Sequence, residues 1–154
     1  MIEVTTHTLS NGLRVAHSLE PQGAMAVVNI LYDTGARDER PDLTGIAHLF
    51  EHLMFGGSAH VPSYANALEY AGGTSNASTG SDFTEFYAQL PVQNIETAFF
   101  LESDRMASPD LSRRALDVQQ HVVIEEFKQV CLNRPYGRVM HILRPMLYPT
   151  HPYR

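Results

Sequence analysis

Cysteine and lysine are nearly absent from this 154-residue sequence, which has one residue of each. Because Cys131 has no second cysteine to pair with, no internal disulfide bond can form. A zinc site built from several cysteines is excluded for the same reason, so a metal ion would need histidine and carboxylate ligands. The sequence has 17 acidic and 11 basic residues, and Lys128 is its only lysine. It contains no basic run that could follow a phosphate backbone. We therefore expect no nucleic-acid partner.

Long apolar runs are also missing. No stretch reaches the roughly 18 consecutive apolar residues of a membrane-spanning helix, and residues 1–4 do not begin the basic-then-apolar pattern of a signal peptide. We expect a soluble chain with no membrane partner, either cytoplasmic or, if a signal peptide has been removed, exported. The 44% hydrophobic and 18% charged residues can still build the core of one domain.

The pattern of apolar and turn residues predicts an α+β fold. The Asn11-Gly12 pair between two β-prone runs is a strong hairpin signal. Later in the chain, Ile95, Phe99 and Met106 define the apolar face of an amphipathic helix. Together these patterns indicate an antiparallel-rich sheet covered by helices. The predicted strands are residues 3–9, 13–18, 24–32, 74–79 and 83–90; the predicted helices run from Asp42 or Thr44 to about Phe55, over 63–71 and 92–106, from Asp110 or Ser112 to about Leu132, and over about 139–143.

The first of these helices contains the run His48-Leu49-Phe50-Glu51-His52. Each residue of an α-helix advances by about 100°, so His48, Glu51 and His52 project from one face. Two imidazoles one turn apart can bind one zinc ion, and the carboxylate between them can act as a general base on water that the metal polarises. Burying these groups among apolar neighbours without a partner would be costly. The motif therefore predicts a zinc site.

Catalytic zinc sites normally use three protein ligands, so a third ligand is needed. The pair Glu125-Glu126 lies on the long fourth helix, where Val122, Val123 and Val130 are the neighbours of Glu126 three and four positions away. Glu126 is therefore expected to face the core, where a divalent cation would compensate its charge. Glu125 is expected to face solvent.

Three segments that carry these residues resemble the pitrilysin/insulinase family of zinc peptidases, which includes the mitochondrial processing peptidase. They are GIAHLFEHLMFGG, AGGTSNASTGSDFTEFYAQLP and VQQHVVIEEFKQ. The resemblance implies one Zn²⁺ per chain, held by His48, His52 and Glu126, with Glu51 as the catalytic base. Glu126 follows His52 by 74 positions, as the family pattern requires. The implied fold is the N-terminal metallopeptidase domain of that family.

Residues 74–79 resemble the edge strand with which this family pairs an extended substrate peptide. Asn76 and Ala77 are therefore candidate substrate-binding residues, because adding a peptide strand explains small side chains and a free backbone edge. The alternative is an ordinary edge hairpin.

Two features depart from the family. Gln119, two turns before Glu126, stands where many members have a second glutamate that supports the metal site, and a neutral amide there would weaken that support. The chain is also much shorter than family members, so we expect residues 1–154 to be most of one truncated N-terminal catalytic domain, with the second homologous domain absent.

The expected function is a zinc-dependent endopeptidase domain that hydrolyses extended peptides and requires a second homologous domain or subunit. The alternatives are a zinc-binding but inactive fragment, and a peptide-binding or scaffold subunit. The other histidines lack ligand spacing, and Cys131 has no basic neighbour in the sequence pattern, so it is expected to be inert.

Overall fold

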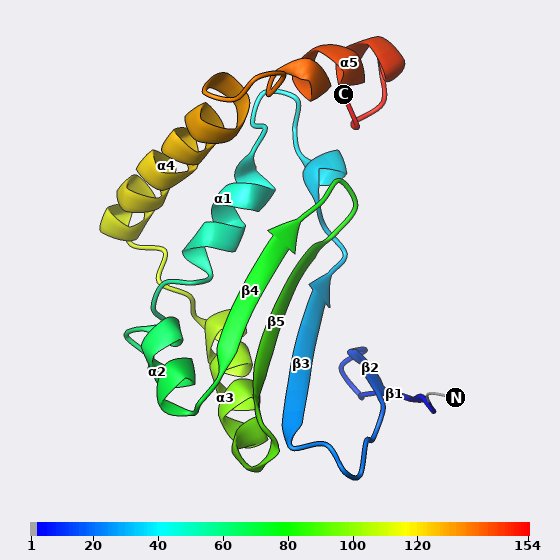
Figure 1. Cartoon of the computed structure of the whole chain (residues 1–154), viewed down its shortest axis with the longest axis vertical. Helices are drawn as coiled ribbons and strands as arrows, with labels where there is room; N and C mark the ends of the chain where they lie inside the picture. Colours follow the sequence, from blue (N-terminus) through cyan, green and yellow to red (C-terminus); the bar gives the residue numbers. More distant parts are fainter. Residues whose placement is uncertain (1–2) are drawn as a thin grey trace.

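The computed structural model describes residues 3–154, which form two small antiparallel sheets and a set of helices (Figure 1). This arrangement confirms the predicted α+β class. The strands are β1 (Thr5–Thr8), β2 (Arg14–His17), β3 (Met25–Tyr32), β4 (Thr74–Thr79) and β5 (Thr84–Pro91). The α-helices are α1 (Ile46–Leu53), α2 (Tyr64–Tyr70), α3 (Ile95–Ala107), α4 (Arg113–Phe127) and α5 (Val139–Leu147); η1 (Ala36–Asp38) and η2 (Val92–Asn94) are 3₁₀ turns, and η3 (Lys128–Leu132) is a π-helical turn.

The larger sheet has the strand order β3-β5-β4, so β5 is central and β4 is an outer strand. Alternate residues of β5 are buried, because one face of the sheet packs on helices while the other stays open. Leu90 of β5, Leu68 of α2 and Leu101 of α3 are the largest fully buried side chains. Each contributes about 1.5–3 kcal/mol by leaving water. This core supports one end of β4, while α1 lies between β4 and α4 (Figure 1).

Helix α3 buries a different face from the predicted one. Phe99 and Met106 are 55% and 46% exposed, whereas Glu102 and Arg105 are only 2% and 3% exposed. The Arg105 guanidinium binds the Glu102 carboxylate at 2.7 Å, and it lies 4.2 Å from the centre of the Tyr64 ring. The prediction was wrong because this ion pair and its aromatic neighbour allow two charged residues to occupy the buried side.

The start of α1 also differs from the prediction. Neither Asp42 nor Thr44 caps the helix, which follows Gly45 in the left-handed conformation at φ 88°. Instead the Glu39 carboxylate accepts hydrogen bonds from the backbone N–H groups of Gly45 and Ala47, both at 2.7 Å. Six and eight positions separate the partners, beyond the reach of a local capping pattern.

The helices at the C-terminal end differ in length from the predictions. Ser112 caps α4 by accepting from the Ala115 N–H at 3.2 Å, but α-helical geometry ends at Phe127 and η3 continues to Leu132. Helix α5 extends beyond the predicted end and includes Pro145 in its last turn. None of the helices in residues 3–154 combines the length and apolar character that crossing a bilayer requires.

Candidate metal centre

Helix α1 presents both motif histidines toward α4. The Nε2 atoms of His48 and His52 lie 3.2 Å apart, with the rings nearly perpendicular at 81°. Their spacing of four positions places them one above the other on the helix, as the motif requires. Leu53, the last residue of α1, is buried and anchors the helix against the core. The two ring nitrogens therefore converge on one point beside α4.

Glu126 of α4 completes a group of three side-chain atoms of the kinds that bind zinc. Its Oε2 lies 3.2 Å from His52 Nε2 and 3.7 Å from His48 Nε2. Tetrahedral zinc with bonds of about 2.0–2.1 Å separates its ligand atoms by about 3.3–3.4 Å. Two imidazole nitrogens and a carboxylate oxygen at these separations fit a zinc ion that keeps one position open to solvent.

The structure turns Glu126, and not Glu125, toward the two imidazoles. Glu125 points away and pairs with Lys128 at 2.7 Å, with 71% of its side chain exposed. The expectation that Glu126 faces the core was wrong, because 43% of its side chain is exposed. Helix α4 buries none of its residues, and its main contacts with other helices or strands are with α1.

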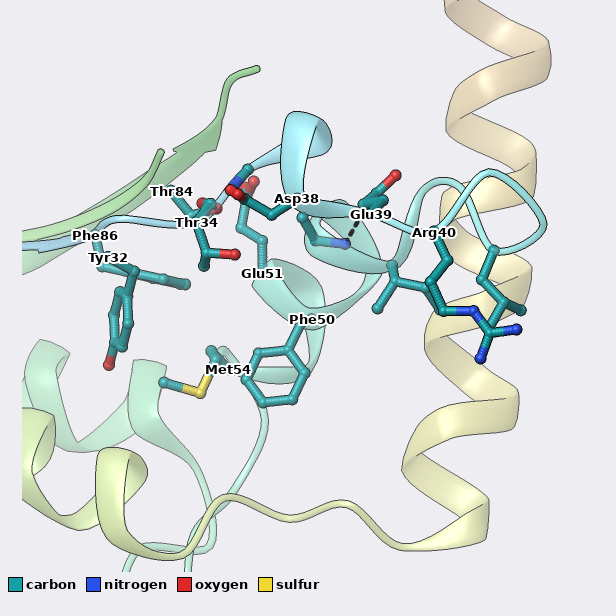
Figure 2. A pocket seen from close by; sticks show the side chains of 14 residues that line it. Tyr32, Thr34, Asp38, Glu39, Arg40, Phe50, Glu51, Met54, Thr84 and Phe86 are labelled. Carbon is teal, nitrogen blue, oxygen red and sulfur yellow. Dashed lines mark hydrogen bonds between the residues drawn. The ribbon is translucent and has the colours of Figure 1, made fainter. Parts of the chain in front are cut away.

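Glu51, the carboxylate of the motif, points toward β4. Its Oε2 accepts a hydrogen bond from the Thr79 hydroxyl at the end of β4. It also lines a cavity of about 440 Å³ with apolar walls that include Phe50 and Met54. Figure 2 shows Glu51 extending toward the loop that carries Thr34 and Asp38. The carboxylate is therefore held by the end of β4 and faces a space that a molecule could enter.

Tyr32 forms part of the wall of the same cavity. Its hydroxyl is the buried side-chain group without a hydrogen-bond partner within residues 3–154. Burial raises the pKa of Tyr32, so the phenol stays neutral at physiological pH. A neutral hydroxyl in an apolar wall can donate to a polar group that enters the cavity.

Asn76 and Ala77 lie in the middle of β4, an outer strand that pairs only with β5 within residues 3–154. The Asn76 side-chain oxygen accepts a hydrogen bond from the Ala77 N–H at 2.9 Å. The side chain of Asn76 is exposed and that of Ala77 is half-buried. The strand therefore has the open edge that was predicted for it, next to the motif helix.

Gln119 lies two turns before Glu126 on α4 and is half-buried. Within residues 3–154, no hydrogen bond links its amide to His48, His52 or Glu126. The support expected from this position therefore stays a prediction.

The prediction that Cys131 has no basic neighbour was wrong. His141 of α5 places its Nε2 3.1 Å from the Cys131 Sγ, and its ring packs edge-on against Phe127 at 5.3 Å. The break in helical geometry between α4 and α5 folds the chain back, so no periodic spacing could have indicated this pair. Sequence reasoning also missed the Thr79–Glu51 hydrogen bond, because it joins a strand to a helix 28 positions away and follows no periodic spacing.

Another histidine, His60, forms a polar cluster with Asp104 and Ser58. The Asp104 carboxylate accepts from the Ser58 hydroxyl at 2.5 Å and lies 2.6 Å from His60 Nδ1. The Ser58 hydroxyl and then His60 lower the pKa of Asp104 to about 2. The cluster ties His60, in the loop after α1, to Asp104 of α3.

Comparison with known proteins identifies the family. Residues 14–148 match the family model described as insulinase (peptidase family M16). The chain belongs to this family. The zinc protease PqqE of Helicobacter pylori is 32% identical over 149 residues, which are 95% of this chain and 34% of that protein. The β subunit of the mitochondrial-processing peptidase of Lentinula edodes is 32% identical over 125 residues, 80% of this chain and 27% of that subunit.

Solved structures of peptidases have the same fold. The crystal structure of a protease from Helicobacter pylori superposes with a TM-score of 0.92 at 29% identity, over 99% of this chain and 37% of that one. Pitrilysin superposes with a TM-score of 0.87 at 24% identity, which shows the shared fold, over 99% of this chain and 16% of pitrilysin. The chain thus spans about a third of the length of the M16 relatives named first.

Proposed function

We propose that this chain is a zinc-dependent endopeptidase domain that hydrolyses extended peptides. The observation that carries the proposal is the convergence of His48 Nε2, His52 Nε2 and Glu126 Oε2 within 4.8 Å of one another, with Glu51 on the same helix. The names of the relatives as zinc proteases support the metal and the reaction class.

In the proposed reaction, His48, His52 and Glu126 hold one zinc ion. When bound, zinc would polarise a water molecule and the scissile carbonyl and offset the negative charge that develops on the carbonyl oxygen. Glu51 takes a proton from the attacking water and then delivers it to the nitrogen of the leaving amine. Because the Thr79 hydroxyl donates to Oε2 of Glu51, we assign the proton transfer to Oε1.

The substrate peptide would add to the open edge of β4, at Asn76 and Ala77. A peptide that accepts from the Ala77 N–H must replace the hydrogen bond that this N–H donates to the Asn76 side-chain oxygen. The freed Asn76 amide can then bind the peptide backbone. Pairing of this kind holds a peptide extended and largely independent of its sequence, because the contacts are made by main-chain groups.

We also propose that full activity requires a second homologous domain or subunit. This proposal has two supports: the chain spans about a third of the length of its relatives, and one relative is named as a subunit. Gln119 favours a second candidate function, in which the chain binds zinc and peptide without hydrolysis. Replacing a residue that supports the metal ligands costs roughly 10- to 100-fold in metal affinity or activity.

Zinc analysis and peptidase assays on Glu51→Gln in the full-length protein test the proposal. We expect the variant to keep one zinc per chain and to lose about 10²- to 10⁴-fold in kcat, the usual contribution of a general base. A wild-type protein that binds zinc but cleaves no peptide would support the non-hydrolytic candidate. A variant that cleaves at the wild-type rate would overturn the role of Glu51.

A further inference from the structure

We propose that Thr79 is the positioning residue for Glu51, and that the strand that receives the peptide thereby also orients the general base. This inference rests on the proposed function. Its carrying observation is the hydrogen bond from the Thr79 hydroxyl to Glu51 Oε2, which joins the last residue of β4 to the middle of α1.

A glutamate side chain has three rotatable torsions, so its carboxylate does not hold one orientation without a partner. A threonine hydroxyl has one hydrogen to donate, and it donates this hydrogen to one oxygen of Glu51. The bond therefore favours one orientation of the carboxylate, and the other oxygen has no hydrogen-bond partner among residues 3–154. Threonine suits this role because its branched Cβ makes the first side-chain torsion stiff.

The backbone of Thr79 is itself held from two sides. Within the hairpin, Thr79 pairs with Thr84 of β5. Beyond it, the Gly80 carbonyl accepts from the Ala36 N–H at 3.2 Å and the Ser81 carbonyl accepts from the Arg37 N–H at 2.9 Å. The strand end is thus braced by β5 and by η1, which makes the hydroxyl a fixed donor toward Glu51.

The same turn depends on a close approach by Gly35. A Cβ at this position would lie 2.7 Å from the carbonyl carbon and oxygen of Ser81, a distance that requires backbone movement. Glycine at this position therefore allows the loop before η1 to approach the β4–β5 turn closely. A chain of contacts therefore links Gly35 to the β4–β5 turn, the turn to Thr79, and Thr79 to Glu51.

This arrangement places two functions in one strand. Asn76 and Ala77 form the open edge for the peptide, and Thr79 three positions from Asn76 holds the base. The backbone of β4 then sets both the position of the scissile bond and the orientation of the carboxylate. Catalysis is sensitive to such alignment, since small displacements of a catalytic group cost rate more than binding.

Three variants of the full-length protein test the role of Thr79. Thr79→Val keeps the shape and removes the hydroxyl, Thr79→Ser restores the hydroxyl, and Thr8→Val makes the same change at the last residue of β1, in the other sheet. We expect Thr79→Val to lower kcat by about 10- to 100-fold with KM changed by less than about twofold. We expect Thr79→Ser to stay within about threefold of wild type and Thr8→Val to match it.

Two further measurements separate positioning from a merely structural role. The affinity for zinc, by competition with a chelator, and the affinity of the zinc-free protein for a non-cleavable peptide analogue should both be unchanged in Thr79→Val. A Thr79→Val protein with wild-type kcat, a change confined to KM, or a loss of zinc would each overturn the inference. If Glu51→Gln loses about 10²- to 10⁴-fold in kcat but Thr79→Val keeps the wild-type kcat, only the inference fails. If Glu51→Gln cleaves at the wild-type rate, the proposed function fails.

Discussion

The Nε2 atom of His52 and the Oε2 atom of Glu126 lie 3.2 Å apart, although 74 positions separate the two residues. The contact joins α1 to α4 across a gap that includes the whole β4–β5 hairpin and two other helices. A candidate zinc site whose residues come from two helices makes the proposed metal binding depend on how these helices pack.

Replacing Glu126 with glutamine should release the metal, and replacing Glu125 should not. A lost ligand should weaken zinc affinity by more than the roughly 100-fold upper range of outer-shell changes. Glu125→Gln removes only an exposed ion pair with Lys128 and should stay within about twofold. Competition with a chromogenic chelator measures both affinities. Zinc release by Glu125→Gln alone would contradict the assignment from the helical phase.

Acid should weaken the fold through Asp104. The pKa of this carboxyl is lowered from 3.8 to about 2 in the folded protein, chiefly by the Ser58 hydroxyl and then by His60. A lowered pKa means that the ionised group stabilises the fold above pH 3.8 and that this contribution is lost as the pH falls through about 2. The difference in Tm between wild type and Asp104→Asn should therefore be largest above about pH 4 and should shrink toward pH 2. A difference that stays constant over this range would contradict the assignment.

Removing Arg105 should destabilise the domain strongly, because it leaves the Glu102 carboxylate buried without its partner. Both side chains are 3% exposed, and breaking a buried pair of this kind costs about 3–5 kcal/mol. We expect Arg105→Met to lower the free energy of unfolding by this amount in denaturant titrations.

The double variant Glu102→Gln, Arg105→Met is the matched control. It removes both charges and keeps an acceptor for the Tyr64 hydroxyl, which donates to Glu102 at 2.6 Å. Part of the lost stability should return. A single variant within about 1 kcal/mol of wild type would show that the pair contributes little.

Gly35→Ala should destabilise the region around the β4–β5 turn. The added methyl group would meet the Ser81 backbone at 2.7 Å, and relieving such an overlap typically costs about 1–3 kcal/mol. Gly12→Ala tests the separate effect of a left-handed glycine, since its added Cβ would meet no atom within 4 Å but its φ is 89°. Thermal unfolding of both variants measures the difference. Unchanged stability in Gly35→Ala would mean that the turn moves freely.

The sequence predicted the elements well where the signal was local. The Asn11-Gly12 hairpin, the 74–79 strand and the helix that carries His48 and His52 follow from turn chemistry and periodicity. The face of α3 was mispredicted because the buried charges of Glu102 and Arg105 cancel each other only in the folded protein. A rule based on hydrophobicity assigns charged residues to the surface and therefore misses this case.

The candidate site shows the same division. The sequence by itself determined that His48, Glu51 and His52 share one helix and that Glu126, not Glu125, has the helical phase of the apolar side of its helix, because a helix repeats every 3.6 residues. Only the tertiary structure decided that Glu126 is half-exposed, that Glu39 caps α1, that His141 reaches Cys131 and that Thr79 binds Glu51. These contacts join residues whose separation has no period, and the packing of whole helices and strands brings them together.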